Sequence, residues 1–434
     1  MNIKSDYFKH ITIVFSGTAM AQIIPILLSP IISRLYTPVD FGIYSFVMSI
    51  GICITAITAS QYNHGIMLEK EIQNAKQVVV VSLVVTILIS TIALIALVIT
   101  VFGFRITSFG EIKYVYILLP LYVLFTGVNS SFSFWNNRNK QYKVISKGRV
   151  VSAVITSGSQ VLMAFIFRDS PFFLLFGLVF GQFCLFIYMF FSTPDLYKDL
   201  LKNFSFFGIK LYGIKYKNFF IYTSFSDLLN ILLMQLPVFI LTKLVGSAHT
   251  GQFAFSNRLL AIPISFFSSS VGEVFKQHAI DEYTKNGACS EIFIKTFKGL
   301  FLFSIFPFII LFIFASDIFA FVFGEVWREA GVFTRIMTPM FFFRFTVSPL
   351  TYIYYINERQ IEDFILHILM LVLIVCSLYF GYYWFKDVNI MLLIYSICFS
   401  GIYIYYFVRS YFLSKRINNN LGNTNENKWE TLQN

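Results

Sequence analysis

The chain has 434 residues, of which 57% are hydrophobic and 13% are charged, and its mean hydropathy is +0.72. A soluble domain carries roughly 45–50% apolar and about 25% charged residues. The composition therefore excludes a soluble globular protein, a disordered chain and a nucleic-acid-binding protein. The net charge of +11 must come from how Lys and Arg are distributed along the chain.

Long runs without charge alternate with short charged segments, and nine of the runs reach the length of a membrane span, which is ~20 apolar residues. Three further apolar segments carry charges inside. Because backbone groups in lipid must be satisfied within their own segment, all twelve are predicted to be helices. In chain order, the predicted spans are 10–33, 41–68, 77–104, 114–137, 150–167, 170–194, 218–242, 250–275, 299–316, 330–356, 364–385 and 388–408.

The first run is interpreted as a retained span, because it is long, contains Pro25 and Pro30 and ends at Arg34 without a small-residue cleavage pattern. The five cysteines show no paired spacing. Neither a structural disulfide nor a metal site is therefore predicted.

Lys and Arg concentrate in every second loop, counting from the N-terminus. The positive-inside rule places these loops on the cytoplasmic side. The chain is thus predicted to be a multi-pass protein of a bacterial inner membrane with both termini in the cytoplasm. Cationic loops beside anionic lipid headgroups explain the net charge.

The two halves of the chain contain similar segments. Leu35, Gly42, Tyr44 and Phe46 match Leu244, Gly251, Phe253 and Phe255 at one constant spacing, between spans one and two and between spans seven and eight. Six spans per half give both halves the same orientation, so a parallel repeat with an axis along the membrane normal is predicted. The predicted parts are a bundle at 1–192, an amphipathic cytoplasmic linker at 193–217, a second bundle at 218–413 and a polar cytoplasmic tail at 414–434.

Charged residues inside predicted spans occur only in the second half. Such residues usually face a cavity or a partner, because an ionisable group at membrane depth costs at least ~2.5 kcal/mol. Arg258 and Arg344 are predicted to line a central, water-filled lumen suited to an anionic headgroup. For Arg335 and Glu273, snorkelling to the membrane surface is an open alternative. Asp227 is predicted to be either a charge partner or an ion-coupling group. A structural ion pair with Arg258 is one option for the first role.

The segment Ser16–Gly42 resembles the opening of Wzx-type polysaccharide repeat-unit flippases of the multidrug/oligosaccharidyl-lipid/polysaccharide exporter superfamily. It contains Gly17, Gln22, Pro25 and Pro30, and then Arg34-Leu-Tyr-x-Pro-x-x-Phe-Gly42. A second segment, Phe255–Pro263, resembles the eighth span of that family. The resemblance implies an all-α fold of twelve transmembrane helices in two six-helix bundles, as in MATE transporters.

The resemblance also implies a function. Such proteins move undecaprenyl-diphosphate-linked oligosaccharide from the inner to the outer leaflet for O-antigen, capsule or related polysaccharide. Arg34, Arg258, Arg344 and Arg335 would bind the diphosphate or glycan. Many relatives have an acidic residue where this chain has Asn63, so His64, with Asp227 and Glu273, is a candidate for ion coupling, although a structural role for His64 is the alternative.

Two other transporter functions stay open, a drug/cation antiporter of the same superfamily and a teichoic-acid or other lipid-linked glycan flippase. A membrane polymerase would need a long outer loop, and no catalytic constellation or nucleotide-binding loop is present in the sequence.

No enzymatic activity, cofactor or nucleic acid is expected. A proton or sodium gradient is the expected energy source, and the expected partners are the lipid-linked oligosaccharide, membrane lipids, a polysaccharide polymerase and a chain-length regulator.

Overall fold

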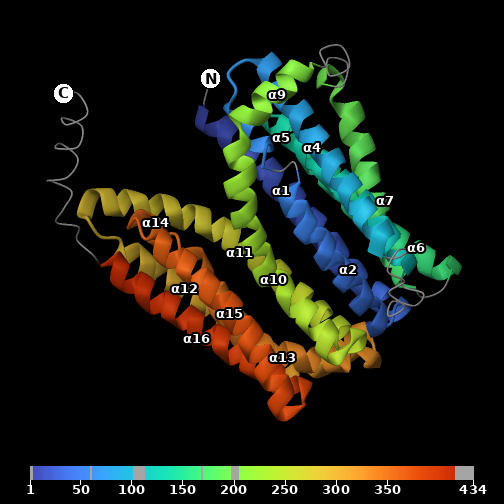
Figure 1. Ribbon diagram of the computed structural model, residues 1–434. Helices are drawn as coiled ribbons and strands as arrows, with labels where there is room; N and C mark the ends of the chain where they lie inside the picture. Colours follow the sequence, from blue (N-terminus) through green and yellow to red (C-terminus); the bar gives the residue numbers. More distant parts are fainter. Residues whose placement is uncertain (1–2, 59–60, 101–112, 168–169, 197–204, 416–434) are drawn as a thin grey trace. The chain divides into compact units, whose positions relative to one another are not determined.

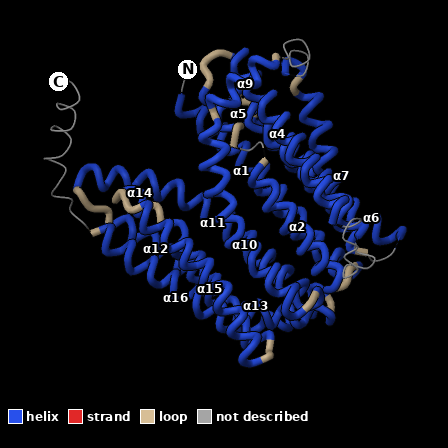
Figure 2. The backbone as a smooth tube through the Cα atoms, in the orientation of Figure 1, coloured by secondary structure: helices blue, strands red, loops and turns tan. Residues whose placement is uncertain are grey.

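The computed structural model describes residues 3–58, 61–100, 113–167, 170–196 and 205–415. Within these ranges every regular element is a helix and no strand occurs (Figure 2). Residues 197–204 of the predicted linker and 416–434 of the predicted tail lie outside the described residues. The all-α fold class is confirmed, whereas the predicted boundaries of the bundles stay a prediction.

Figure 1 shows the described helices in chain order. The first part of the chain forms α1 (Ile3–Leu35), α2 (Pro38–Ile57), α3 (Asn63–Leu68), α4 (Ile72–Val98), α5 (Lys113–Arg138), α6 (Tyr142–Phe167), α7 (Pro171–Ser192) and α9 (Phe206–Lys215). The second part forms the π-helix η3 (Phe219–Thr223), α10 (Ser224–Val245), α11 (Ser247–Asn286), α12 (Ser290–Phe323), the 3-10 helix η4 (Glu325–Trp327), α13 (Arg328–Val347), the 3-10 helix η5 (Ser348–Leu350), α14 (Ile353–Ile356), α15 (Gln360–Phe385) and α16 (Val388–Ser414).

Eleven of the described helices are long and apolar enough to cross a membrane. The protein is therefore a multi-pass membrane protein. The predicted tenth span, 330–356, corresponds to α13 followed by η5 and α14. Helix α13 is not among the eleven, and it contains Arg335 and Arg344 in addition to two charged residues at its start.

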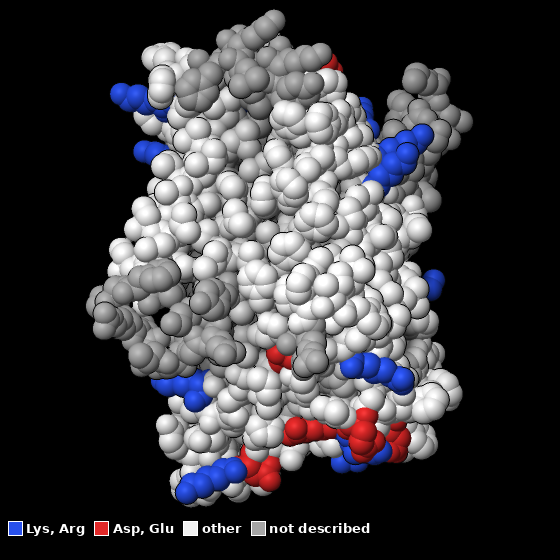
Figure 3. Space-filling view, turned by 90° about the vertical axis from the view of Figure 1, so that its right-hand side faces the viewer, with Lys and Arg blue, Asp and Glu red and all other residues white. Residues whose placement is uncertain are grey.

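Apolar side chains cover the outer faces of these helices. Leu302, Phe306 and Phe321 on α12 are 72%, 69% and 84% exposed. Exposed apolar surface of this extent is unfavourable in water but matches lipid tails. In the view of Figure 3, uncharged residues make up most of the described surface that is visible.

Local sequence signals define the helix ends near the predicted repeat. Thr37 caps α2, accepting a hydrogen bond from the Asp40 amide at 3.2 Å, while Asp40 accepts one from the Thr37 amide at 2.9 Å. Such a capping box satisfies two otherwise unpaired amides. Gly246 has φ 85° in the turn between α10 and α11, a backbone conformation that favours glycine.

The predicted second span, 41–68, differs from the structure. Helix α2 ends at Ile57, and a separate helix, α3, begins at Asn63. At the end of α2, the Thr58 hydroxyl and amide both bind the Thr55 carbonyl. A run without charges can therefore contain a helix end, because polar uncharged side chains compete for backbone hydrogen bonds.

The contacts divide the chain into two compact units. The first unit contains residues 1–255 and 319–330, and the second contains 256–318 and 331–434. In the first unit, α6 packs against α1 and α7, α5 packs against α4 and α7, and α10 packs along α2. In the second unit, α15 packs against α16, and the short helix α14 contacts both.

Candidate functional site

The carboxylate of Asp227 lies inside a long apolar helical segment of the first unit. Asp227 is in the first turn of α10 and is half-buried. The span that contains it, Phe219–Val245, begins about 12 Å away along the helix axis at 1.5 Å per residue. An ionisable side chain at such a depth needs a polar partner or water.

Gln61 is a partner of this carboxylate. Its Nε2 donates a hydrogen bond to Oδ2 of Asp227 over 2.5 Å. The Gln61 side chain is buried, with 1% of its surface exposed. It lies just before α3, and α10 reaches it because α10 packs along α2. The sequence pointed to a guanidinium as partner of Asp227, and pairing with Arg258 stays a prediction.

Three buried oxygen atoms of Gln61 or of residues close in sequence to Gln61 and Asp227 make no hydrogen bond to any described residue. They are Oε1 of Gln61, Oδ1 of Asn63 and Oγ of Ser224. Ser224 begins α10 three residues before Asp227, so both lie on one face of the helix. Asn63 uses its Nδ2 to donate to Ser130 over 3.0 Å. We call Gln61, Asn63, Ser224 and Asp227 the Asp227 cluster.

Aromatic residues next to the Asp227 cluster in the sequence pack against one another. The Tyr62 ring stacks on Phe220 with centroids 5.5 Å apart. His64, a predicted ion-coupling candidate, is exposed, and its ring lies 5.4 Å from that of Phe134 and 5.9 Å from that of Phe219. Its ion-coupling role stays a prediction. Phe219 and Phe220 belong to the π-helix η3, an element that occurs frequently at functional sites.

Among the arginines that are predicted to bind the cargo, Arg344 of the second unit is half-buried. Arg344 lies in the last turn of α13, and its guanidinium carbon is 5.9 Å from the centre of the Phe341 ring. It also interacts electrostatically with Tyr395 and Tyr403 of α16. A cation among aromatic rings and phenol hydroxyls is stabilised in a partly apolar environment and can still bind an anion.

The other predicted residues are all exposed. Arg34, at the end of α1 in the first unit, donates from Nη2 to the carbonyl of Phe321 over 3.2 Å. In the part of the chain that the structure describes, Arg258, Arg335 and Glu273 of the second unit form no hydrogen bond or ion pair. The predicted lumen role of these four residues stays a prediction.

The two matching segments of the predicted repeat contact each other in the first unit. A Cβ atom added to Gly42 would lie 1.8 Å from the carbonyl oxygen of Ser247, and one added to Gly251 would lie 1.8 Å from the carbonyl oxygen of Pro38. Ser247 matches Pro38 at the spacing that relates the two glycines. Reciprocal contacts of this kind are typical of two-fold-related elements. We call the crossing of α2 and α11 at these residues the repeat junction.

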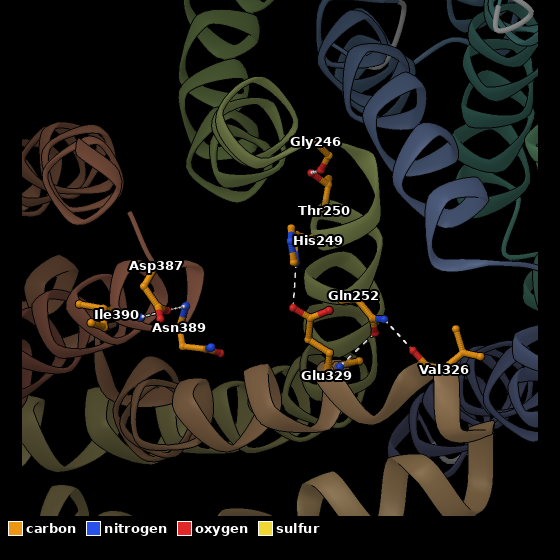
Figure 4. Close-up of polar contacts among 10 residues, drawn as sticks. Gly246, His249, Thr250, Gln252, Val326, Glu329, Asp387, Asn389 and Ile390 are labelled. Carbon is orange, nitrogen blue, oxygen red and sulfur yellow. Dashed lines mark hydrogen bonds and ion pairs between the residues drawn. The ribbon is translucent and has the colours of Figure 1, made fainter. Parts of the chain in front are cut away.

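A polar network adjoins the repeat junction (Figure 4). His249 Nδ1 lies 2.8 Å from Glu329 Oε1, and Gln252 donates from Nε2 to the Val326 carbonyl over 2.7 Å. The amide of Ala330 donates to Oε1 of Gln252 over 3.0 Å. The side chain of Gln252 thus uses both its donor and its acceptor to hold the turn between α12 and α13 against α11.

A second polar network joins α9 to the rest of the first unit. Lys215 and Tyr216 both donate to Oε1 of Glu69, the Tyr216 hydroxyl over 2.8 Å. Arg138 donates to the carbonyl of Ile66 over 2.7 Å in the same region. Burial raises the pKa of the Glu69 carboxyl, but hydrogen bonds from Lys215 and Tyr216 outweigh burial and leave that pKa below its usual value.

Stability at low pH is expected to depend on Glu69. A lowered folded-state pKa contributes stability that is present above the unfolded pKa of about 4.3 and is lost as the pH falls through the folded value. We expect the unfolding temperature of the purified protein to fall below about pH 5, and Glu69→Gln to flatten part of that fall. The measurement is thermal unfolding in detergent from pH 7 to 3. An unchanged pH profile in Glu69→Gln would contradict the assignment.

Sequence reasoning missed two polar residues. Gln61 is uncharged and lies inside a predicted span, so no charge marks it. Arg149 lies just outside the predicted span 150–167, but the structure places it within α6, where its Nη1 donates to Oγ1 of Thr18 on α1 over 2.6 Å. A span that is delimited by its lack of charge has to end at the first charged residue. A charged residue inside a helix, such as Arg149, is therefore left outside the predicted span. The close approach of Gly17 on α1 to Ser146 on α6 marks the same helix pair.

A family model described as "Polysaccharide biosynthesis protein" matches residues 31–331. The chain belongs to the polysaccharide biosynthesis protein family. This match and the structural neighbours described below confirm the resemblance seen in the sequence. No curated protein matches the chain.

Several solved structures share the fold of this family member. An inward-facing multidrug resistance MATE transporter of the MOP superfamily has a TM-score of 0.74 at 12% identity, with 90% of this chain and 93% of that chain covered. The lipid II flippase MurJ has a TM-score of 0.70 at 13% identity, with coverages of 93% and 90%. A MOP superfamily transporter from Pyrococcus furiosus has a TM-score of 0.62 at 12% identity, with coverages of 94% and 95%. The MATE-like fold is thereby confirmed.

Proposed function

We propose that the protein is a translocase without enzymatic activity that flips undecaprenyl-diphosphate-linked oligosaccharide from the inner to the outer leaflet of a bacterial inner membrane. The family match over residues 31–331 carries this proposal. A fold shared with MurJ, a lipid II flippase, supports it. The product would be used for O-antigen, capsule or a related glycan by a polymerase and a chain-length regulator, and both termini would lie in the cytoplasm.

The charge of the cargo supports a role for Arg344. A diphosphate carries its negative charges between the lipid and the glycan, so it must cross the membrane core with them. Arg344 offers a guanidinium, which binds phosphate oxygens in a two-pronged geometry that an ammonium cannot reproduce. Arg258 and Arg335 are further candidates for cargo binding in the same unit, and Arg34 is a candidate in the first unit. Alternating access, driven by a proton or sodium gradient, would expose the bound cargo to each leaflet in turn.

Replacing Arg344 tests this role. We expect Arg344→Ala to lower flipping at least tenfold, because a charged hydrogen bond to phosphate contributes roughly 1.5–3 kcal/mol. Arg344→Lys should keep part of the activity, since the charge remains. The measurement is surface glycan in cells whose only copy of the gene is the variant, with the amount of protein in the membrane determined in parallel.

Arg328 provides a matched control on the same helix. It pairs with Glu325 at the surface, with 2.5 Å between Nε and Oε1, and exposed pairs contribute little to stability. Arg328→Ala should therefore leave flipping near the wild-type level. Full surface glycan in Arg344→Ala would overturn the role of Arg344 in cargo binding.

The location of the cargo tests the function itself. In a strain that lacks only this gene, complete lipid-linked repeat units should accumulate on the cytoplasmic leaflet and surface glycan should disappear. Repeat units that reach the outer leaflet without being polymerised would contradict the proposal.

A drug/cation antiporter is the second candidate, and the likeness to a multidrug resistance MATE transporter favours it. The carboxylate of Asp227 offers a group that a cation could bind. Under this alternative, deletion of the gene would leave surface glycan normal and change the sensitivity of the cells to cationic drugs. A teichoic-acid or other lipid-linked glycan as cargo would appear in the same experiment as a different trapped lipid.

A further inference from the structure

We propose that Arg149 and Thr18 form a binding site in the first unit for the phosphate group of a lipid. The lipid is either the diphosphate-linked cargo or a phospholipid of the membrane, and both carry this chemical group. The inference deepens the proposed function and rests on it only where the lipid is the cargo. Binding of a phosphorylated lipid can be measured without transport.

The first argument is a positive charge inside an apolar span. Arg149 lies within α6, which is long and apolar enough to cross a membrane. It is about 10 Å along the helix axis from Tyr142, where α6 begins, at 1.5 Å per residue. Among the described residues Arg149 forms no ion pair, and its one hydrogen bond goes to the uncharged hydroxyl of Thr18. A charged group in such a position needs a partner or a cavity, so the guanidinium is suited to an anionic ligand.

The second argument is that two hydrogen-bond donors lie together. Nη1 of Arg149 donates to Oγ1 of Thr18 over 2.6 Å, so this hydroxyl accepts a hydrogen bond from the guanidinium and can itself donate one to a ligand. A guanidinium has five N–H groups, and the bond to Thr18 uses one of them. An oxyanion beside the pair can therefore accept hydrogen bonds from both side chains. Paired N–H donors are also what makes arginine a phosphate-binding residue.

The faces of α1 show how a ligand reaches the pair. Met20 and Leu27 belong to an apolar face of α1 and are 55% and 69% exposed, as is suited to lipid tails. Thr18 and Gln22 lie on the opposite side of the helix, because one turn takes 3.6 residues. Arg149 contacts this polar side and is nevertheless exposed. The site is therefore accessible from the polar side of α1.

Close packing of α1 against α6 fixes the site. A Cβ atom added to Gly17 would lie 1.7 Å from Oγ of Ser146. Gly17 directly precedes Thr18, and Ser146 lies one turn before Arg149. The distance between the guanidinium and the hydroxyl is thus set by the contact of two helices. Donors that are held in place before binding lose less conformational freedom when a ligand binds.

The position of the site favours an anion that is carried by a lipid. A free anion would have to leave water to reach a point inside a span, whereas a lipid already holds its phosphate at the membrane surface. Lys140 and Lys143 are exposed at the start of α6, before Arg149. Cations near the membrane surface attract anionic headgroups, and basic pockets between transmembrane helices bind them.

Native mass spectrometry of the purified full-length protein, with one probe lipid added at a time, tests the proposal. The probes are undecaprenyl diphosphate, phosphatidylglycerol and undecaprenol, which has no phosphate. We expect the wild type to retain a phosphorylated probe. Arg149→Ala should weaken that retention at least tenfold, because a charged hydrogen bond is lost, and Arg149→Lys should keep part of it. Retention of undecaprenol should be the same in all variants.

Two changes at Thr18 separate its hydroxyl from its size. Thr18→Val removes the hydroxyl at nearly constant volume and should weaken retention of the phosphorylated probe severalfold, whereas Thr18→Ser should retain it like the wild type. Lys147→Ala is the matched control. Lys147 is an exposed cation two residues before Arg149 and lies on the other side of α6, so its removal should leave retention near the wild-type level.

The outcomes distinguish the two lipids and the two proposals. Monodisperse elution and thermal unfolding would show that each variant is folded. Loss of undecaprenyl diphosphate in Arg149→Ala would assign the site to the cargo, and loss of phosphatidylglycerol would assign it to a membrane phospholipid. A wild type that retains neither phosphorylated probe would overturn the site. Equal retention of both by folded Arg149→Ala would also overturn it and leave Arg149 as a structural link between α1 and α6. Retention without any flipping in cells would refute the proposed function and keep the site.

Discussion

Replacing Gly251 with alanine is expected to destabilise the first unit strongly. The added Cβ would lie 1.8 Å from the Pro38 carbonyl oxygen and 2.8 Å from the Gly42 amide nitrogen. Both neighbours are backbone atoms, so no side chain can rotate to relieve the overlap, and α2 and α11 would have to move apart. Densely packed interiors resist such shifts. We expect Gly251→Ala to lower the yield of monodisperse protein severalfold and to lower its unfolding temperature.

The reciprocal change, Gly42→Ala, should have a similar effect, because its Cβ would meet the Ser247 carbonyl at the same distance. Gly299→Ala on α12 is the matched control. No atom lies within 4 Å of a Cβ added there, and alanine is favoured over glycine inside a helix by roughly 1 kcal/mol. The control should fold at least as well as the wild type. Wild-type stability of Gly251→Ala would show that the two helices do not approach closely at this point.

The spans and the repeat could be predicted because both depend on local sequence patterns. Apolar runs of membrane length are fixed by bilayer thickness, so most predicted spans coincide with described helices. Gly42 and Gly251 stand out at equivalent positions because the crossing of α2 and α11 leaves no room for a side chain. The interruption at Thr58 could not be predicted in this way, since a helix end made by uncharged polar groups changes hydropathy little.

The candidate site was only partly predictable. Asp227 is visible in the sequence as an acid inside an apolar segment, whereas Gln61 has no charge and lies far away in the chain. Their hydrogen bond depends on α10 packing along α2, which is a tertiary contact. Arg34, which the family resemblance assigns to cargo binding, donates a hydrogen bond to the carbonyl of Phe321 near the end of α12, and its role in cargo binding stays a prediction.

Replacing Trp327 with alanine is expected to destabilise the protein by about 3–5 kcal/mol, the usual cost of removing a large buried aromatic side chain. Trp327 is 1% exposed, and its ring centre lies 4.4 Å from that of Phe255 and 5.1 Å from that of Phe41. Its Nε1 donates to the carbonyl of Ser33 over 2.7 Å. Thermal unfolding of the purified protein in detergent measures the loss.

Trp327→Phe separates the hydrogen bond from the packing. Phenylalanine keeps a ring against Phe41 and Phe255 but leaves the Ser33 carbonyl, one of the last in α1, without its donor, at a cost of roughly 1–3 kcal/mol. The Ser33 hydroxyl in turn donates to the carbonyl of Phe323, the last residue of α12, over 3.1 Å. The ends of α1 and α12 thus satisfy each other, so Trp327→Phe should lie between the wild type and Trp327→Ala. Equal unfolding temperatures for Trp327→Phe and the wild type would mean that packing alone fixes this junction.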